Sequence, residues 1–434
     1  MDFQIEGGRK LNGTAVTKTS KNGAVVLLCA SLLNKGKTTL KNMPRIEEVS
    51  RIIEVLASIG VGVRWENQND VVITPPKKIS LSKINRASAE KTRSIILFLG
   101  PLIHVLKSFK IPQAGGCKLG SRTVRPHLYA LEKFGVDIEA TSKDYEVKVG
   151  KLKNADVVMY ESGDTATENA IMAASLISGK STIRFSASNY MVQELCFFLS
   201  DLGVKIEGIG TPLLTIYGVE EIKKDIEYCP SEDPIESMLF LSIAATTNSA
   251  IKIERCPIDF LALELLKLEK MGFKYKASKT YKALNGRTNL VDIETRASKL
   301  TALEEKIHPL PYPGLNIDNL PFFVPIATQA KGKTLIHDWV YENRAIYYME
   351  LNKLGAEVIL ADPHRVFIEG PTELKATEIV CPPALRPAAI ILIAMLTAEG
   401  ISILRNVYSI ARGYEDLAER LNKLGASVAV LEKE

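Results

Sequence analysis

The chain has 434 residues, of which 46% are hydrophobic, and its 55 basic and 50 acidic side chains leave a formal net charge of +5. Because a chain of this length exceeds what one hydrophobic core normally serves, two domains are expected. The near balance of charge, without a basic stripe interleaved with aromatic residues, argues against a nucleic-acid partner.

A short helical pattern followed by Gly and then a β-strand recurs six times along the chain. The repeated glycines lie roughly 70 residues apart, which is too long for the common solenoid repeats and long enough for a complete α+β unit. Since each unit can bury its own helix against its own strands, the repeats predict α/β domains of three units each. The glycines are Gly60, Gly135, Gly203, Gly272, Gly355 and Gly425.

Each repeat also begins with an apolar helical pattern that leads through a turn to a β-branched strand. Because these segments are apolar on nearly every face, the helices are expected to be buried. The second helix of each repeat carries Glu and Lys and is expected to be the outer, half-exposed one. The first helices are expected at residues 24–33, 95–103, 170–177, 238–245, 322–327 and 388–396.

No apolar run reaches the roughly 18 residues that a membrane span needs, and the first residues lack the basic-then-apolar pattern of a secretion signal. A cytoplasmic protein without a membrane partner is therefore expected. The six cysteines show neither CxxC spacing nor clustering with His. This pattern argues against zinc and against a disulfide framework, and no metal or other cofactor is expected.

The residues just before the buried helices are the most polar in each repeat and are candidates for ligand binding. Helix N-termini carry unpaired N–H groups and a partial positive charge, so they favour anionic ligands. Simple helix capping is the alternative explanation for four of these residues. A cation at a helix N-terminus is repelled by the helix dipole, so capping does not explain Lys or Arg at these positions, and ligand binding is the better explanation. The possible caps are Asp164, Thr165, Asp233 and Asn316, and the cations are Lys21, Arg93 and Arg386.

Two segments interrupt the repeat. Residues 113–122 form a Gly-rich loop that is expected to act as a lid. Its Cys117 lies beside basic residues, which would lower the thiol pKa and suit a proton donor or nucleophile, although loop cysteines are commonly incidental. Residues 309–318 are a Pro-rich approach that delivers Asp318 to a helix start, a way to fix a base in space.

Several motifs follow one another along nearly the whole chain: Lys21-Asn22, the Gly-Gly-Cys117 loop with Arg122, Pro-Tyr-Pro-Gly before Asp318, Glu-Asn-Arg344, Leu-Arg386 and Arg412-Gly-Tyr-Glu. Taken in this order, these motifs resemble the enolpyruvyl transferases. The resemblance implies two inside-out α/β barrel domains of three units each, with the active site in the interdomain cleft. The first domain would span residues 22–230, and the second would combine residues 1–21 with 231–434.

The resemblance also implies a reaction and a set of site residues. Phosphoenolpyruvate would donate its enolpyruvyl group to the 3′-hydroxyl of UDP-N-acetylglucosamine, the first committed step of peptidoglycan and cell-wall synthesis. Cys117 would protonate the methylene carbon, and it is the thiol that fosfomycin alkylates in the family. Asp318 would take the proton from the sugar hydroxyl. The implied phosphoenolpyruvate-binding residues are Lys21, which also belongs to the catalytic set, Arg122, Arg344, Arg386 and Arg412.

The implied sugar-nucleotide residues depart from the family pattern. After the lid the family has Arg-Pro-Val-Asp, whose Asp helps to hold the uracil, whereas this chain ends the same stretch with Arg125. The family's diphosphate contacts, a Lys and then Ser-Val-Gly, are replaced by a stretch with Glu161 and Asp164. An acidic group facing a diphosphate would be repulsive by roughly 1 kcal/mol, which Arg125 would offset if it reaches across. The full set is Asn22, Arg93, Arg122, Arg125, Gly163, Asp164, Thr165 and Asp318.

Three interpretations therefore stay open. The first is a transferase that acts on UDP-N-acetylglucosamine. The second is a paralogue that moves the enolpyruvyl group to a different nucleotide or sugar nucleotide. The third is a catalytically silent relative that binds or regulates, although the intact Cys117, Asp318 and cation set count against it.

Overall fold

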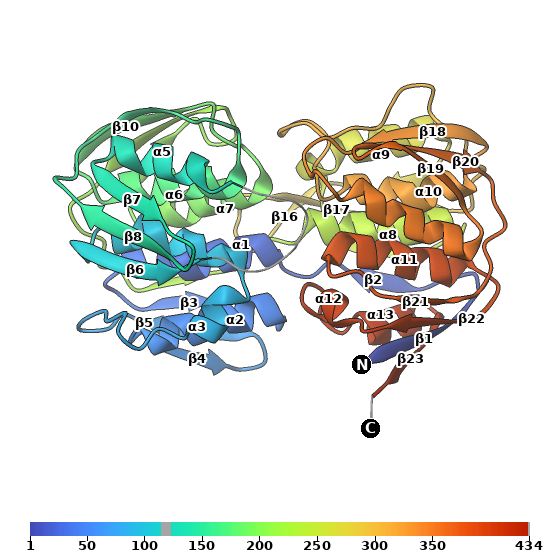
Figure 1. Ribbon diagram of the computed structural model, residues 1–434, viewed down its shortest axis with the longest axis horizontal. Helices are drawn as coiled ribbons and strands as arrows, with labels where there is room; N and C mark the ends of the chain where they lie inside the picture. Colours follow the sequence, from blue (N-terminus) through green and yellow to red (C-terminus); the bar gives the residue numbers. More distant parts are fainter. Residues whose placement is uncertain (114–122, 433–434) are drawn as a thin grey trace. The chain divides into compact units, whose positions relative to one another are not determined.

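The computed structural model describes residues 1–113 and 123–432 as a mixed α/β chain. These residues form two compact units, one of residues 19–113 with 123–231 and the other of residues 1–18 with 232–432 (Figure 1). The chain thus passes between the units after residues 18 and 231, close to the expected boundaries at residues 21 and 230. Among the described residues, no helix is both long and apolar enough to cross a bilayer.

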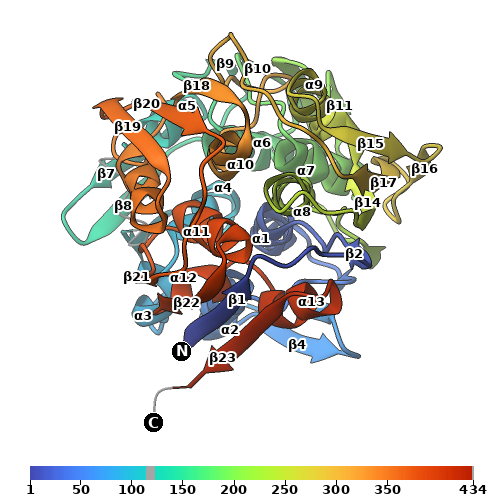
Figure 2. The same ribbon diagram turned by 90° about the vertical axis from the view of Figure 1, so that its right-hand side faces the viewer.

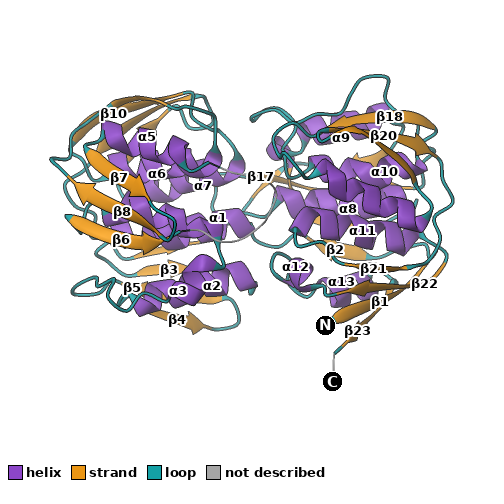
Figure 3. Ribbon diagram, in the orientation of Figure 1, coloured by secondary structure: helices purple, strands orange, loops and turns teal. Residues whose placement is uncertain are grey.

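In the unit of residues 19–231 the apolar first helices are buried, as predicted. The second of them divides into a 3₁₀ segment, η2, followed by a short α-helix, α4. Figure 3 shows strands lying around these helices. The helices are α1 (Lys21–Ala30), η1 (Ser31–Leu33), α2 (Glu47–Ser58), α3 (Arg86–Glu90), η2 (Arg93–Phe98), α4 (Leu99–Leu102), α5 (Arg125–Lys133), α6 (Asp164–Ser175) and α7 (Tyr190–Asp201).

Three sheets belong to this unit, with orders β13-β3-β5-β4, β6-β8-β7 and β11-β12-β10-β9. Most neighbours are antiparallel, but β13 and β9 each add a parallel strand at an edge. The strands are β3 (Thr38–Leu40), β4 (Gly62–Glu66), β5 (Asp70–Thr74), β6 (Ser108–Pro112), β7 (Val136–Ala140), β8 (Asp144–Val149), β9 (Asp156–Val158), β10 (Gly179–Arg184), β11 (Lys205–Glu207), β12 (Leu213–Gly218) and β13 (Ile226–Tyr228).

The unit of residues 1–18 and 232–432 repeats this plan. Its buried helices α8, α10 and α11 lie at the centre of the unit with the strands around them (Figure 2). The helices are α8 (Pro234–Thr246), η3 (Ile258–Phe260), α9 (Ala262–Lys270), η4 (Leu320–Phe322), α10 (Phe323–Gln329), η5 (Ala345–Leu354), α11 (Leu385–Thr397), α12 (Tyr408–Ala411) and α13 (Leu417–Lys423).

The sheets of this unit have the orders β21-β22-β1-β23, β15-β17-β14-β2 and β18-β20-β19, with β16 paired to β17. The N-terminal strand β1 therefore completes a sheet made by the last strands of the chain. The strands are β1 (Asp2–Gly7), β2 (Thr14–Val16), β14 (Lys252–Pro257), β15 (Lys274–Ala277), β16 (Tyr281–Lys282), β17 (Asn289–Arg296), β18 (Gly332–His337), β19 (Glu357–Asp362), β20 (Arg365–Gly370), β21 (Glu378–Val380), β22 (Gly400–Arg405) and β23 (Ser427–Leu431).

The repeated glycines behave alike. All six have positive φ, between +86° and +104°, which is the left-handed conformation that glycine adopts at helix ends without a steric penalty. The prediction of an outer, half-exposed second helix is wrong for α7, where eight of twelve residues are buried. The physical reason is its composition, since Met191, Leu195 and Phe198 pack it into the core against α1.

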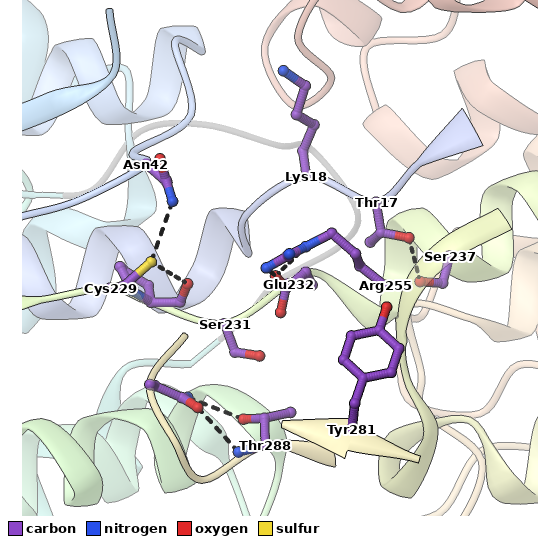
Figure 4. Close-up of polar contacts among 12 residues, drawn as sticks. Thr17, Lys18, Asn42, Cys229, Ser231, Glu232, Ser237, Arg255, Tyr281 and Thr288 are labelled. Atoms are coloured by element: carbon purple, nitrogen blue, oxygen red, sulfur yellow. Dashed lines mark hydrogen bonds and ion pairs between the residues drawn. The ribbon is translucent and has the colours of Figure 1, made fainter. Parts of the chain in front are cut away.

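Side chains anchor each of the two crossing segments within its own unit. The Thr17 and Ser237 hydroxyls are hydrogen-bonded at 2.9 Å, and Arg255 pairs with Glu232 (Figure 4). In the other unit, the Asn42 amide donates to the Cys229 thiol sulfur at 3.4 Å. None of the five cysteines in the described residues forms a disulfide.

Candidate active site

Asp318 stands on a tight turn between the Pro-rich segment and η4. The Asn316 side chain accepts a hydrogen bond from the Asp318 amide at 2.8 Å within this turn. The N-cap of η4 is Asn319, so the helix-capping explanation is wrong for Asn316. The Asp318 carboxylate is partly exposed and receives a hydrogen bond from Arg386 at 3.3 Å, while Nη1 of Arg344 lies 3.9 Å away. One carboxylate is thus held between two guanidinium groups.

Arg344 lies just before η5 and, although an arginine at such a position is commonly a solvated surface residue, it is only 1% exposed. Its Nε and Nη2 donate to the two carboxylate oxygens of Asp338 at 2.6 and 3.0 Å, and Nη2 also donates to the Ile317 carbonyl at 2.8 Å. Burial works against the charged guanidinium, but Tyr348 and Asp338 outweigh it and raise the net pKa of Arg344. The side chain therefore fixes the backbone beside Asp318.

Arg386 lies in the first turn of the buried helix α11 and donates to the Tyr414 hydroxyl at 2.7 Å. Tyr414 follows Arg412 and Gly413 in the chain. A Cβ on Gly413 would lie 2.2 Å from a methyl group of Leu385, so this segment packs directly on the start of α11. Arg412 is half-buried on the same segment. The structure thus gathers Asp318, Arg344 and Arg386 and places Arg412 on the segment that packs beside Arg386.

The other candidate residues lie in the unit of residues 19–231. Lys21 and Asn22 begin α1, capped by Ser20. The Lys21 ammonium donates to the Asn22 side-chain oxygen at 3.3 Å, and the Asn22 amide donates to the Tyr190 hydroxyl at 3.0 Å. The start of α1 is therefore joined to the start of α7.

Gly163, Asp164 and Thr165 lie at the start of α6. Gly163 occupies the N-cap position, so the capping explanation is wrong for Asp164 and Thr165, whereas Asp233 does cap α8. The Asn189 amide donates to the Asp164 carboxylate at 3.2 Å. Glu161 is exposed. The carboxyl group of Glu168 lies buried behind this helix start, and burial, with a smaller contribution from Asp164, raises its pKa.

His127 was not singled out in the sequence, yet it supports Thr165. The Asn169 amide donates to Nδ1 of His127 at 2.9 Å, because its carbonyl oxygen already accepts from the Gly100 amide. His127 must then carry its proton on Nε2, which donates to the Thr165 hydroxyl at 3.3 Å. Burial and the nearby charge of Arg93 lower the pKa of His127 to about 3, so the ring is neutral.

Arg93 begins η2, where the Thr92 side chain caps the segment and donates to Glu48. Arg125 begins α5; it is exposed, and its side chain forms no ion pair with the described residues, so the expected compensation of Glu161 and Asp164 is absent from this structure. Cys117 and Arg122 lie outside the described residues. Sequence reasoning missed Asp338, Tyr348 and Tyr190 because their roles depend on contacts across the fold.

Comparisons with known proteins agree with this architecture. The family model for EPSP synthase (3-phosphoshikimate 1-carboxyvinyltransferase) matches residues 5–421. A relative from Treponema denticola, named UDP-N-acetylglucosamine 1-carboxyvinyltransferase, is 36% identical over 436 residues and 100% of both chains. A relative of the same name from Helicobacter pylori is 34% identical over 438 residues, again 100% of both chains.

Solved structures extend the likeness to the fold. The enolpyruvyl transferase NikO from Streptomyces tendae has a TM-score of 0.83 at 21% identity, covering 99% of this chain and 98% of that chain. EPSP synthase from Acinetobacter baumannii has a TM-score of 0.79 at 17% identity, covering 100% of both chains.

The α/β fold and the full-length relatives define an enzyme of the enolpyruvyl transfer class. The chain belongs to the EPSP synthase (3-phosphoshikimate 1-carboxyvinyltransferase) family of enolpyruvyl transferases. Enzymes of this family use phosphoenolpyruvate and an acceptor that bears a hydroxyl group.

Proposed function

We propose that the protein transfers the enolpyruvyl group of phosphoenolpyruvate to the 3′-hydroxyl of UDP-N-acetylglucosamine, releasing phosphate in the first committed step of peptidoglycan synthesis. The observation that carries the proposal is the Asp318 carboxylate held between the guanidinium groups of Arg386 and Arg344. The shared name of the full-length relatives supports the choice of acceptor. Each unit would be an inside-out α/β barrel.

In this proposal Asp318 is the general base. It removes the proton from the sugar hydroxyl as the oxygen attacks C2 of phosphoenolpyruvate, while Cys117 protonates the methylene carbon C3. The resulting tetrahedral ketal then returns a proton from C3 to the Cys117 thiolate and expels phosphate, which leaves the enolpyruvyl ether.

Cations would bind the donor. Phosphoenolpyruvate presents a phosphate and a carboxylate, and guanidinium groups bind both bidentately. The proposal assigns this task to Lys21, Arg122, Arg344, Arg386 and Arg412. In the present structure the Nε and Nη2 donors of Arg344 are occupied by Asp338 and Ile317, so its Nη1, directed to Asp318, is the group left for a ligand.

The sugar nucleotide would be bound by helix starts of the other unit. Asn22, Arg93, Arg122, Arg125 and residues 163–165 are assigned to it, together with Asp318. A second candidate function is transfer to another nucleotide or sugar nucleotide. One observation favours it: Glu161 and Asp164 place acidic groups in the stretch assigned to the diphosphate, and the Arg125 side chain pairs with neither of them.

The test measures phosphate release from phosphoenolpyruvate by the full chain with UDP-N-acetylglucosamine, UDP-N-acetylgalactosamine, UDP-glucose and shikimate 3-phosphate. Release with UDP-N-acetylglucosamine alone is expected. The variant D318N should lower kcat roughly a hundredfold or more, because a general base contributes at least that factor. The variant C117S should escape alkylation by fosfomycin.

Other results would redirect the assignment. Release with a different acceptor would favour the second candidate function, and release with none of them would overturn both. Asn422→Ala is a matched control, since the Asn422 side chain bonds to the backbone of Val428 and takes no part in the proposed chemistry. Its kcat should match that of the wild type.

A further inference from the structure

Glu264 lies under the turn that carries Asp318, although it is distant in the chain. It belongs to α9 and is 2% exposed. One carboxylate oxygen, Oε1, accepts a hydrogen bond from the Asn319 side-chain amide at 2.7 Å and a second from the Asn316 backbone amide at 3.3 Å. The two donors flank Asp318 on either side.

Further hydrogen bonds hold the backbone of the turn, although the side-chain oxygen Oδ1 of Asn319 is buried without a hydrogen-bond partner among the described residues. The Asp318 amide donates to the Asn316 side chain at 2.8 Å, and the Leu320 amide donates to the Asn316 carbonyl at 3.1 Å. The Ile317 carbonyl accepts from Arg344 at 2.8 Å. The backbone below Asp318 is therefore held from two directions, by Glu264 of α9 and by Arg344 at the start of η5.

Burying a carboxyl group at this position costs free energy of desolvation. Burial raises the pKa of Glu264, and this effect is only partly offset by hydrogen bonds from Asn319, from the Glu264 backbone amide and from Asn316, and by the charge of Lys267. An apolar side chain would avoid the desolvation cost of a buried carboxyl group. An apolar side chain would, however, provide no acceptor for the amide groups of Asn316 and Asn319. These two hydrogen bonds are therefore the physical reason for a carboxyl group at this position.

We propose that Glu264 is a positioning residue for the reaction: it fixes the turn of residues 316–319 so that the Asp318 carboxylate is presented to the acceptor hydroxyl. The inference rests on the proposed role of Asp318 as general base. Proton transfer depends on donor and acceptor lying within hydrogen-bond reach, and misplacement by about 1 Å costs up to roughly a hundredfold in rate. Binding of phosphoenolpyruvate by cations is less sensitive to such a shift.

The first measurement compares Glu264→Ala with Glu264→Gln. The Ala variant removes the acceptor and should lower kcat about tenfold while the KM for phosphoenolpyruvate changes less than twofold. The Gln variant keeps an oxygen at the same place and should retain most of the wild-type kcat. Asn319→Ala cuts one of the two contacts and provides a second variant should Glu264→Ala fold poorly; it should also lower kcat, by a smaller factor.

The second measurement separates positioning from loss of stability. In the D318N background, Glu264→Ala should produce no further fall in kcat, because there is no base left to position. Hydrogen exchange of the Asn316 and Asp318 amides should be roughly tenfold faster in Glu264→Ala than in the wild type. Asn422→Ala, the matched control, should leave both kcat and these two amides unchanged.

The outcomes separate the two proposals. An active wild type whose kcat is unchanged in folded Glu264→Ala and Asn319→Ala would overturn the positioning role and leave the proposed function intact. An equal further fall of kcat in the D318N background would likewise overturn it, since the effect would then bypass Asp318. A wild type that releases no phosphate with any acceptor would instead overturn the proposed function and, with it, the catalytic meaning of the turn.

Discussion

Arg344 and Asp338 form an ion pair that is almost fully removed from water, with exposed side-chain fractions of 1% and 0%. Such a pair contributes little net stability, because desolvation offsets most of the Coulomb attraction, but removing one partner strands the other. Tyr348 donates to the same carboxylate at 2.6 Å, so every oxygen of Asp338 is used. The cluster of Arg344, Asp338 and Tyr348 therefore provides a rigid support for the turn that carries Asp318.

His127 offers a residue-scale prediction about pH. Its folded-state pKa of about 3 lies below the value near 6.5 of an unfolded chain, so protonation favours unfolding. The stability that depends on neutral His127 is complete above about pH 6.5 and is lost as the pH falls, by about 1.4 kcal/mol for each pH unit. His127→Gln keeps a donor for Thr165 and an acceptor for Asn169 but cannot titrate.

We therefore expect the free energy of unfolding of the wild type to fall more steeply than that of His127→Gln between pH 6.5 and 4.5. Urea unfolding at several pH values measures the difference. His104, whose pKa burial lowers to about 4, acts in the same direction but is present in both proteins, so its effect cancels in the comparison. Parallel curves for the two proteins would show that His127 is not held neutral.

The sequence indicates some of the residues of the candidate site but not others. Asp318, Arg344 and Arg386 were selected because of their motifs, and the structure brings them together. Glu264, Asp338 and His127 were not, because a carboxyl group or imidazole on a helix or strand end carries no local mark of the partner it meets. Their partners lie on other elements, and only the folded chain reveals them.

At the scale of elements, strand ends pack on the ends of buried helices. A Cβ on Gly218 of β12 would lie 2.2 Å from the Ile177 carbonyl oxygen and 2.3 Å from that of Ala174, just after α6 and within it. The next amide, Val219, donates to the Ser175 carbonyl at 2.9 Å and satisfies a free acceptor at the helix end. Gly7 and Gly370 make the same close approach to α11 and α10.

Gly218→Ala should therefore destabilise the protein more than a substitution at a repeated turn glycine. The clash is with backbone atoms that cannot move aside, so we expect a loss of about 3 kcal/mol in the free energy of unfolding. Gly203→Ala is the control: its φ of +104° strains an alanine, but no atom lies within 4 Å, so the loss should be about 1 kcal/mol. Urea unfolding measures both, and equal losses would refute the packing argument.

An element can be predicted from the sequence when its conformation depends on residues close to it in the chain. The apolar helices depend on residues within one repeat, and the prediction that they are buried is confirmed. The left-handed conformation of the repeated glycines is equally local. The burial of α7 and the 3₁₀ form of η5 were not foreseen. The Glu in α7 (Tyr190–Asp201) led to the expectation of a half-exposed helix. Glu194 is nevertheless buried, because the Tyr228 hydroxyl and the Ser231 amide donate hydrogen bonds to its carboxylate.

At the scale of the whole molecule, the sequence repeats correspond to six sheets among the described residues, three in each compact unit. Chain length and the sixfold pattern led to the expectation of two domains of three repeats each. The site residues fall into two sets, one on each unit, because the motifs that bear them are spread over almost the whole chain. The proposed function assigns both sets to one reaction, an assignment that comes from the family resemblance and not from composition or periodicity.

Ligand binding links that reaction to the stability of the chain. A ligand that binds only the folded protein stabilises it by about 2.7 kcal/mol at a hundred times its Kd. If the start of α6 faces the diphosphate, the Asp164 carboxylate repels it by roughly 1 kcal/mol, so Asp164→Asn should bind UDP-N-acetylglucosamine about fivefold more tightly. Arg125→Ala should bind it more weakly, because an exposed cation is lost.

Thermal unfolding with increasing UDP-N-acetylglucosamine measures these affinities without turnover, and N-acetylglucosamine without the diphosphate serves as the control ligand. We expect the Asp164→Asn variant to show a larger rise in Tm than the wild type at the same nucleotide concentration, and no such difference with the free sugar. Identical Kd values for the wild type and both variants would place the diphosphate away from α6 and α5. That result would shift the acceptor assignment toward a different ligand while leaving Asp318 and its guanidinium neighbours as the reacting centre.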